Sequence, residues 1–128
     1  MICFIISESP CSHRSVQPIG IQSFHGHLSG AQDDQLLACV APRALYVASA
    51  SKDFWADPKG ELMGLVEASK IYKLYGAKKL PTMECLEIEK PFIGDNIGYH
   101  LRDGVHNMTT YDWEQYLNFA ESVFGKQK

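Results

Sequence analysis

The sequence has neither a long hydrophobic run nor a strong excess of charge. Its apolar start, residues 2–6 (ICFII), spans only five residues and follows no basic segment. That is too short for a signal peptide or a membrane helix. The formal net charge is −3 at pH 7, and no stretch collects lysine and arginine in the way that nucleic-acid binding requires. We therefore expect a chain that binds neither a membrane nor nucleic acid, and its compartment stays open.

Metal-binding patterns are also missing. The four cysteines are scattered without CxxC spacing. Cys39 stands in the apolar run LLACVAP and is predicted to be a buried free thiol. His25 and His27 flank a glycine, but no cysteine or carboxylate follows at a ligand spacing. The sequence thus predicts no metal site, and an ordinary polar loop around His25.

The composition indicates one globular domain. Hydrophobic residues make up 45% of the 128-residue chain, which is enough to build a core. Residues 1–32 are expected to be irregular and to lie outside this domain, because proline and glycine recur there without a sustained period. The domain itself is expected over residues 33–128.

From residue 33 onward the pattern is that of an α/β protein. A short helix is predicted over residues 35–40. The near-continuous apolar run 44–48 (ALYVA) predicts a strand covered on both faces, as in a parallel sheet. A helix should start at Pro58, with the Asp57 side chain as its N-cap, and end at Gly76.

A second strand and another helix follow. The alternation in residues 97–101 (IGYHL) predicts a strand, which should break at Asp103 and Gly104. The last helix is predicted to begin at Thr109 or Thr110, with acidic residues in its first turn.

Two loops carry the candidate chemistry. Asp53 comes after the first of these strands, and His106 comes after the second. This is the order in which α/β-hydrolases supply the last two members of a Ser-His-Asp triad. His100, on the strand itself, is the rival histidine. Asp57 is the rival acid and is better explained as a helix cap.

Residues 36–59 (LLACVAPRALYVASASKDFWADPK) and 93–113 (IGDNIGYHLRDGVHNMTTYDW) resemble the C-terminal part of the bacterial glucuronoyl esterases, carbohydrate esterase family fifteen. The resemblance is most specific at residues 41–43 (APR), at residues 55–58 (WADP) and at the Gly-x-His that precedes Thr and Tyr-Asp-Trp. It implies an α/β fold that is the incomplete, C-terminal portion of an α/β-hydrolase, with a short parallel sheet and flanking helices. The first thirty residues take no part in it.

The same resemblance implies the chemistry. His106 matches the catalytic histidine, which takes the proton of the nucleophile and returns it to the leaving alcohol. Asp53 matches the acid that orients it. The implied substrate is a 4-O-methyl-glucuronate ester of xylan–lignin links, cleaved through an acyl-enzyme without a cofactor. Members of the family are usually secreted or periplasmic. Trp55 has two interpretations, a wall of the sugar site or packing over the strand end.

A nucleophile is missing. A nucleophile elbow needs glycine two residues before the serine and usually two after it. Ser23, the serine nearest to glycines, has Ile21 and His25 there, and the family's Gly-x-Ser-Arg-x-Gly-Lys motif does not occur. We therefore expect a C-terminal piece of an ester hydrolase that is inactive alone, truncated or joined to an unrelated start. The alternatives are a part of another esterase or peptidase of this fold, and a non-catalytic fragment that docks on a separate N-terminal half.

Such a piece should keep strands that belong in the interior of a larger sheet. Leu45, Val47 and Ile97 are accordingly predicted to lie on or beside an unprotected sheet edge, where other chains can pair. Self-association is the expected consequence.

Overall fold

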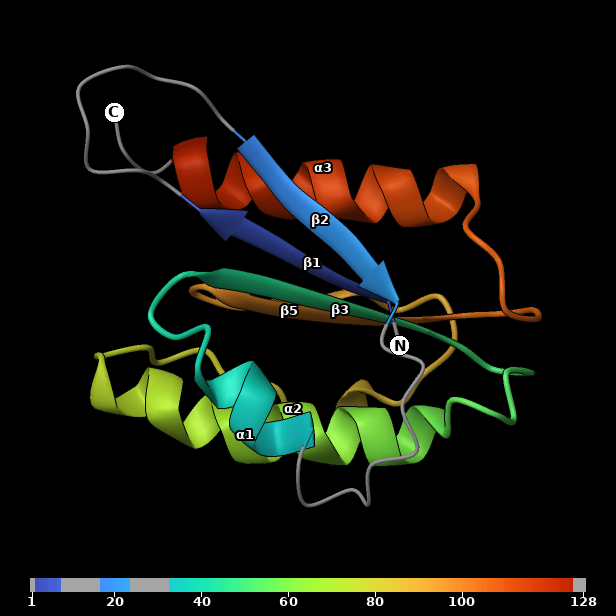
Figure 1. Cartoon of the computed structure of the whole chain (residues 1–128), viewed down its shortest axis with the longest axis horizontal. Helices are drawn as coiled ribbons and strands as arrows, with labels where there is room; N and C mark the ends of the chain where they lie inside the picture. Colours follow the sequence, from blue (N-terminus) through green and yellow to red (C-terminus); the bar gives the residue numbers. More distant parts are fainter. Residues whose placement is uncertain (1, 8–16, 24–32, 126–128) are drawn as a thin grey trace.

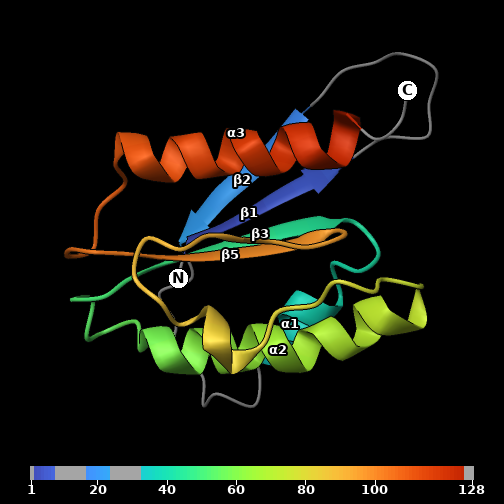
Figure 2. The ribbon, with the colours of Figure 1, turned by 180° about the vertical axis from the view of Figure 1, so that it is seen from behind.

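The computed structural model describes residues 2–7, 17–23 and 33–125, which form three layers around one sheet (Figure 1). Helix α3 (Thr110–Phe124) covers one face of the sheet. Helices α1 (Asp33–Ala38) and α2 (Pro58–Leu74) cover the other face, as the view from behind also shows (Figure 2). Within these three ranges, no helix is long and apolar enough to cross a bilayer.

The sheet has five strands in the order β2-β1-β3-β5-β4. Their bounds are Ile2–Ser7 for β1, Gln17–Ser23 for β2, Ala44–Ala50 for β3, Phe92–Ile93 for β4 and Ile97–Arg102 for β5. The central pair, β3 and β5, is parallel, and the other three pairs are antiparallel. The sheet is therefore mixed, and the expected parallel arrangement is confined to its centre.

Two strands lie within residues 1–32, which the sequence predicts to be irregular. Strand β1 pairs along β3 from Ile2↔Ala48 to Ile6↔Ala44, and β2 pairs with β1 on its outer side. The run of β-forming residues in β1 is too short to show the alternation that predicts a strand. It forms a strand because it pairs with β3, which is far away in the sequence. Because β1 covers this edge, Leu45 and Val47 lie on an interior strand, so the predicted exposed edge is wrong for β3. Ile97 lies on β5, next to the two-residue edge strand β4, as the prediction of a position beside a sheet edge allows.

The core is divided by the sheet into two halves. All seven residues of β3 and all six of β5 are buried, which explains the near-continuous apolar sequence of β3. The half under α2 is formed mainly by aliphatic and tyrosine side chains, among them Leu45, Val47, Leu62, Leu65, Tyr72, Ile97, Tyr99 and Leu101. The half under α3 is smaller and more aromatic: Ala44, Tyr46, Ala48, Tyr116 and Phe119.

The long helices begin and end close to the predicted positions. Helix α2 starts at Pro58 and stops before Gly76, whose φ of +92° suits a residue without a side chain. Helix α3 starts at Thr110, after a capping box in which Thr109 and Asp112 satisfy one another's backbone amides.

Two local predictions are wrong. Asp57 occupies the N-cap position of α2, but its side chain makes no capping hydrogen bond. Its backbone is left-handed, with φ of 47°, instead of extended as at a usual N-cap, and its carboxylate lies close to Gly60 without accepting a capping hydrogen bond. Cys39 is free but exposed, because α1 has already ended and the chain turns its neighbours Leu37 and Val40 inward instead.

Candidate active site

The parallel pairing of β3 and β5 brings the acid loop and the histidine loop together. The strands run in register from Leu45↔Ile97 to Ala50↔Arg102, so both end at the same edge of the sheet. Loop residues continue the pairing, with the Lys52 amide donating to the Gly104 carbonyl over 2.9 Å. The carboxyl ends of parallel strands are where α/β folds place their ligand sites.

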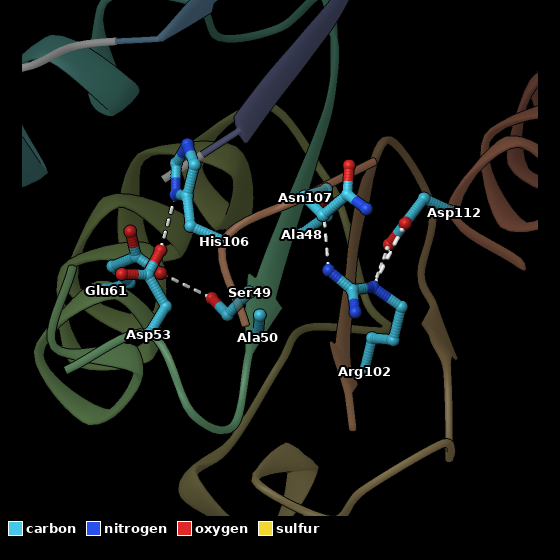
Figure 3. Close-up of a pocket in the computed structure, with 9 residues that line it drawn as sticks. All are labelled: Ala48, Ser49, Ala50, Asp53, Glu61, Arg102, His106, Asn107 and Asp112. Atoms are coloured by element: carbon cyan, nitrogen blue, oxygen red, sulfur yellow. Dashed lines mark hydrogen bonds and ion pairs between the residues drawn. The ribbon is translucent and has the colours of Figure 1, made fainter. Parts of the chain in front are cut away.

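His106 and Asp53 meet at this edge. The Nδ1 atom of His106 lies 2.5 Å from the Oδ2 atom of Asp53 (Figure 3). The Asp53 side chain is 8% exposed and the His106 side chain 46% exposed. Because the carboxylate accepts hydrogen bonds, Nδ1 carries the proton and Nε2 is the basic nitrogen. A buried acid that holds one nitrogen of a half-exposed imidazole is the geometry of a general base.

A small pocket lies beside this pair. It is lined by the end of β3, the acid loop, the start of α2, the end of β5 and the start of α3 (Figure 3). The lining residues are Ala48, Ser49, Ala50, Asp53, Glu61, Arg102, His106, Asn107 and Asp112. Sequence reasoning places only Asp53 and His106 in it.

Glu61 is a pocket residue that sequence reasoning missed. Its side chain accepts a hydrogen bond of 2.5 Å from the Ser49 hydroxyl, and only 8% of the residue is exposed. Burial raises the pKa of Glu61 above its ordinary value. Sequence reasoning missed Glu61 because acidic residues are common in the first turn of a helix, where they interact favourably with the helix dipole.

The serines nearest to the pair are engaged elsewhere. Ser49 is 5% exposed and donates to Glu61. Ser51 donates to the Asp103 carboxylate over 2.8 Å. Neither serine stands on a strand-to-helix turn of the nucleophile-elbow type, so the described structure presents neither of them as a nucleophile.

His100, the rival histidine, is sealed inside the protein. It is 0% exposed, its Nδ1 atom lies 3.1 Å from the Tyr46 hydroxyl, and its Nε2 atom lies 2.9 Å from Asp112. Burial lowers the pKa of His100, so the ring is neutral at pH 7, donates through Nε2 and accepts at Nδ1. His100 does not line the pocket, and its role is structural.

The acid loop also carries two large apolar side chains that are exposed to solvent. Trp55 is 100% exposed and Phe54 is 85% exposed. The interpretation of Trp55 as packing over the strand end is therefore wrong. In the part of the chain that the structure describes, no group of three or more His, Cys, Asp or Glu side chains is placed to hold a metal ion.

Comparison with known proteins identifies relatives of this chain. No family model matches the sequence. Over 86 residues the chain is 40% identical to a carbohydrate esterase from an unknown prokaryotic organism, a match that covers 67% of this chain and 20% of that protein. The glucuronoyl esterase from Solibacter usitatus is 49% identical with a TM-score of 0.65, over 70% of this chain and 23% of that one. The chain matches the C-terminal part of the glucuronoyl esterases.

Two further structures of carbohydrate esterase family fifteen agree. A promiscuous esterase of carbohydrate esterase family fifteen from the marine bacterial metagenome is 36% identical with a TM-score of 0.64, covering 70% of this chain and 22% of that one. The glucuronoyl esterase from Teredinibacter turnerae is 30% identical with a TM-score of 0.60, covering 68% and 21%. The chain therefore spans between 20% and 23% of the length of these relatives. Its described fold is a partial α/β-hydrolase fold.

Proposed function

We propose that this chain supplies the histidine and the acid of a Ser-His-Asp triad to a carboxylic ester hydrolase of the glucuronoyl esterase type. The observation that carries the proposal is the contact of 2.5 Å between His106 Nδ1 and Asp53 Oδ2 at the carboxyl edge of the parallel pair. Two loops 53 residues apart in sequence meet there, in the order in which α/β-hydrolases supply the acid and the histidine.

In this mechanism His106 is the general base. Its Nε2 atom takes the proton of a serine hydroxyl as that hydroxyl attacks the ester carbonyl. Asp53 keeps the proton on Nδ1 and stabilises the imidazolium that forms. His106 then returns the proton to the leaving alcohol, and a water molecule releases the acyl group in the same way.

The substrate and the missing nucleophile follow from the resemblance. The relatives are named glucuronoyl esterases, which supports a glucuronate ester as the substrate, with an alcohol of lignin as its leaving group. The sequence contains no nucleophile elbow, so the serine and the oxyanion hole must come from another segment. The N-terminal half of a hydrolase of the same fold has the required chemistry.

The test is an assay of the purified chain on a benzyl glucuronate ester, alone and after addition of a hydrolase half that carries Gly-x-Ser-Arg-x-Gly-Lys. We expect no turnover above background from the chain alone, because each missing oxyanion donor costs about 100- to 1000-fold in rate. Turnover should appear in the mixture. It should fall by about 10,000-fold in His106→Ala and in Asp53→Asn, as removal of a triad member does.

Asp103→Asn is the matched control, since Asp103 is an exposed acid in the histidine loop and does not line the pocket. This variant should keep the activity of the mixture. Turnover by the chain alone that disappears in His106→Ala would contradict the proposal, because the chain would then hold its own nucleophile. A mixture whose activity is unchanged in both His106→Ala and Asp53→Asn would refute the assignment of the two residues.

A further inference from the structure

Arg102 lies behind the His106 loop and is buried. It is the last residue of β5, and its side chain is 8% exposed. Its Nε atom lies 3.0 Å from one carboxylate oxygen of Asp112 and 3.2 Å from the other. An arginine at this depth needs a partner charge and further acceptors for its remaining N–H groups.

The remaining acceptors are backbone carbonyls of the histidine loop. Nη1 donates to the carbonyl of Asp103 over 3.0 Å. Nη2 donates to the carbonyls of Val105 and Asn107 over 3.0 Å and 2.7 Å. These three carbonyls precede and follow His106, so the guanidinium holds the backbone on both sides of the histidine. Hydrogen bonds from a charged donor are stronger than those between neutral groups.

The anchor of the guanidinium is itself fixed. One oxygen of Asp112 accepts from the amide and the hydroxyl of Thr109 over 2.6 Å and 2.8 Å. The other accepts from His100 over 2.9 Å. Asp112 therefore cannot follow the loop, and Arg102 is tied to the start of α3 rather than to a mobile side chain.

The loop is wrapped closely around this group. Gly104 has φ of +127°, and a Cβ atom there would lie 2.7 Å from Arg102 Nη1. A residue with a side chain at this position would have to push the guanidinium away from the carbonyls. The glycine is required by the approach of the backbone to the arginine.

We propose that Arg102, held by Asp112, is a positioning residue that sets the backbone of the histidine loop so that His106 Nδ1 meets Asp53. The inference rests on the proposed function, since it assigns a role at the same site. Arg102 does not touch the reacting atoms and acts through the loop. A lysine cannot replace it, because a single ammonium group cannot reach one carboxylate and three carbonyls in a fork.

The test measures the tautomer of His106 in the 128-residue chain. The nitrogen chemical shifts of the ring, which distinguish its two tautomers, are recorded by NMR in alkaline solution. In the unaltered chain the contact with Asp53 favours the Nδ1–H tautomer, and an imidazole that loses this partner shifts toward Nε2–H. Asp53→Asn gives the shifts expected when the carboxylate is gone.

We expect Arg102→Lys to lower the ratio of Nδ1–H to Nε2–H by about tenfold or more, toward the value of Asp53→Asn, while the far-ultraviolet circular dichroism stays the same. Asp112→Asn should shift the ratio in the same direction. Arg43→Lys is the matched control: Arg43 also donates to backbone carbonyls, those of Val40 and Cys39, and it lies at the opposite end of β3 from the Asp53 loop. It should leave the ratio unchanged.

Each other outcome has a defined meaning. A folded Arg102→Lys chain with the ratio of the unaltered protein would overturn the positioning role and leave the proposed function standing. Failure of both Arg102→Lys and Asp112→Asn to fold would make Arg102 a core residue and would also overturn the role. An unaltered chain that already has the shifts of Asp53→Asn would instead remove the contact on which the proposed function depends.

Discussion

Two histidine–aspartate pairs in the part of the chain that the structure describes differ in their access to water. In the pair at the loops, His106 is 46% exposed above a buried Asp53. In the pair inside the protein, the side chains of His100 and Asp112 are 0% and 3% exposed. Both pairs join an imidazole nitrogen to a carboxylate within hydrogen-bonding distance. The difference in burial shows that the residue types alone do not define a catalytic pair. The imidazole of His106 is open to solvent and accessible for the proton transfer that we propose, whereas the imidazole of His100 is enclosed by the fold.

The backbone explains this difference. His100 lies in the middle of β5, and the alternation of the strand turns it toward the aromatic core under α3, where it lies 5.5 Å from the Tyr46 ring. Both of its nitrogens have partners there, so a neutral buried ring costs little. His106 lies four residues after the end of β5, in a loop whose backbone is held while its side chain is half exposed.

Removing the buried acid should have the largest effect on stability. Asp112→Ala deletes the ion pair with Arg102, the hydrogen bond to His100 and half of the capping box of α3. We expect the free energy of unfolding to fall by about 3–5 kcal/mol, the usual cost of removing one partner of a buried charge pair. Urea denaturation followed by circular dichroism measures it.

Asp103→Ala is the comparison for that variant, because Asp103 forms an exposed ion pair with Lys52. Its loss should cost much less than the loss of Asp112, because solvent screens an exposed ion pair. Equal losses in the two variants would mean that the inner pair contributes no more than a surface contact.

The buried pair should also make stability depend on pH. Burial, opposed by the hydrogen bond to Asp112, lowers the pKa of His100 below its ordinary value of 6.5. The unfolded chain therefore binds a proton at His100 more readily than the folded chain does. Stability is complete above about pH 6.5 and decreases as the pH falls below it. Melting temperatures between pH 8 and pH 5 should show this decrease, and His100→Gln should reduce it.

Asp112 contributes at lower pH. Burial alone would raise the pKa of Asp112, but the hydrogen bonds from Thr109 and His100 lower it below the ordinary value of 3.8. Its contribution is therefore present above about pH 3.8 and is lost only below it. A decrease in melting temperature between pH 8 and pH 5 that is the same in His100→Gln would show that other groups cause it.

The smallest effect on stability is expected for the exposed pair. His106→Ala removes a half-exposed side chain, although it leaves Asp53 without that contact. The free energy of unfolding should change by at most about 1 kcal/mol, which is typical of surface positions. The same urea titration checks it. A loss as large as that of Asp112→Ala would mean that His106 supports the fold rather than chemistry.

Local sequence signals were enough for the pair at the loops. The order of strand, Asp53, helix, strand and His106 can be read without knowing any contact, and parallel pairing then brings the two loop ends together. The start of α3 at Thr110 was equally local, because the capping box lies within four residues.

Features that depend on contacts between residues far apart in sequence could not be predicted from the sequence. Residues 2–7 form strand β1 because they pair with β3, some forty residues away, and no local pattern in residues 2–7 predicts that pairing. Arg102 and Asp112 look like ordinary charged residues at the ends of elements, and only the fold shows that they bind one another and the histidine loop. The domain boundary between residues 32 and 33 remains a prediction.

The antiparallel strand β1 has a kinetic consequence for any partner that would extend this sheet. It already pairs with the main-chain groups of β3 from Ala44 to Ala48, on the side of β3 that faces away from β5. A strand arriving at that side must replace β1 rather than add to it, so the two compete for the same donors and acceptors. Association by that route would be limited by the opening of β1. Its rate would then level off as the concentration of the partner increases.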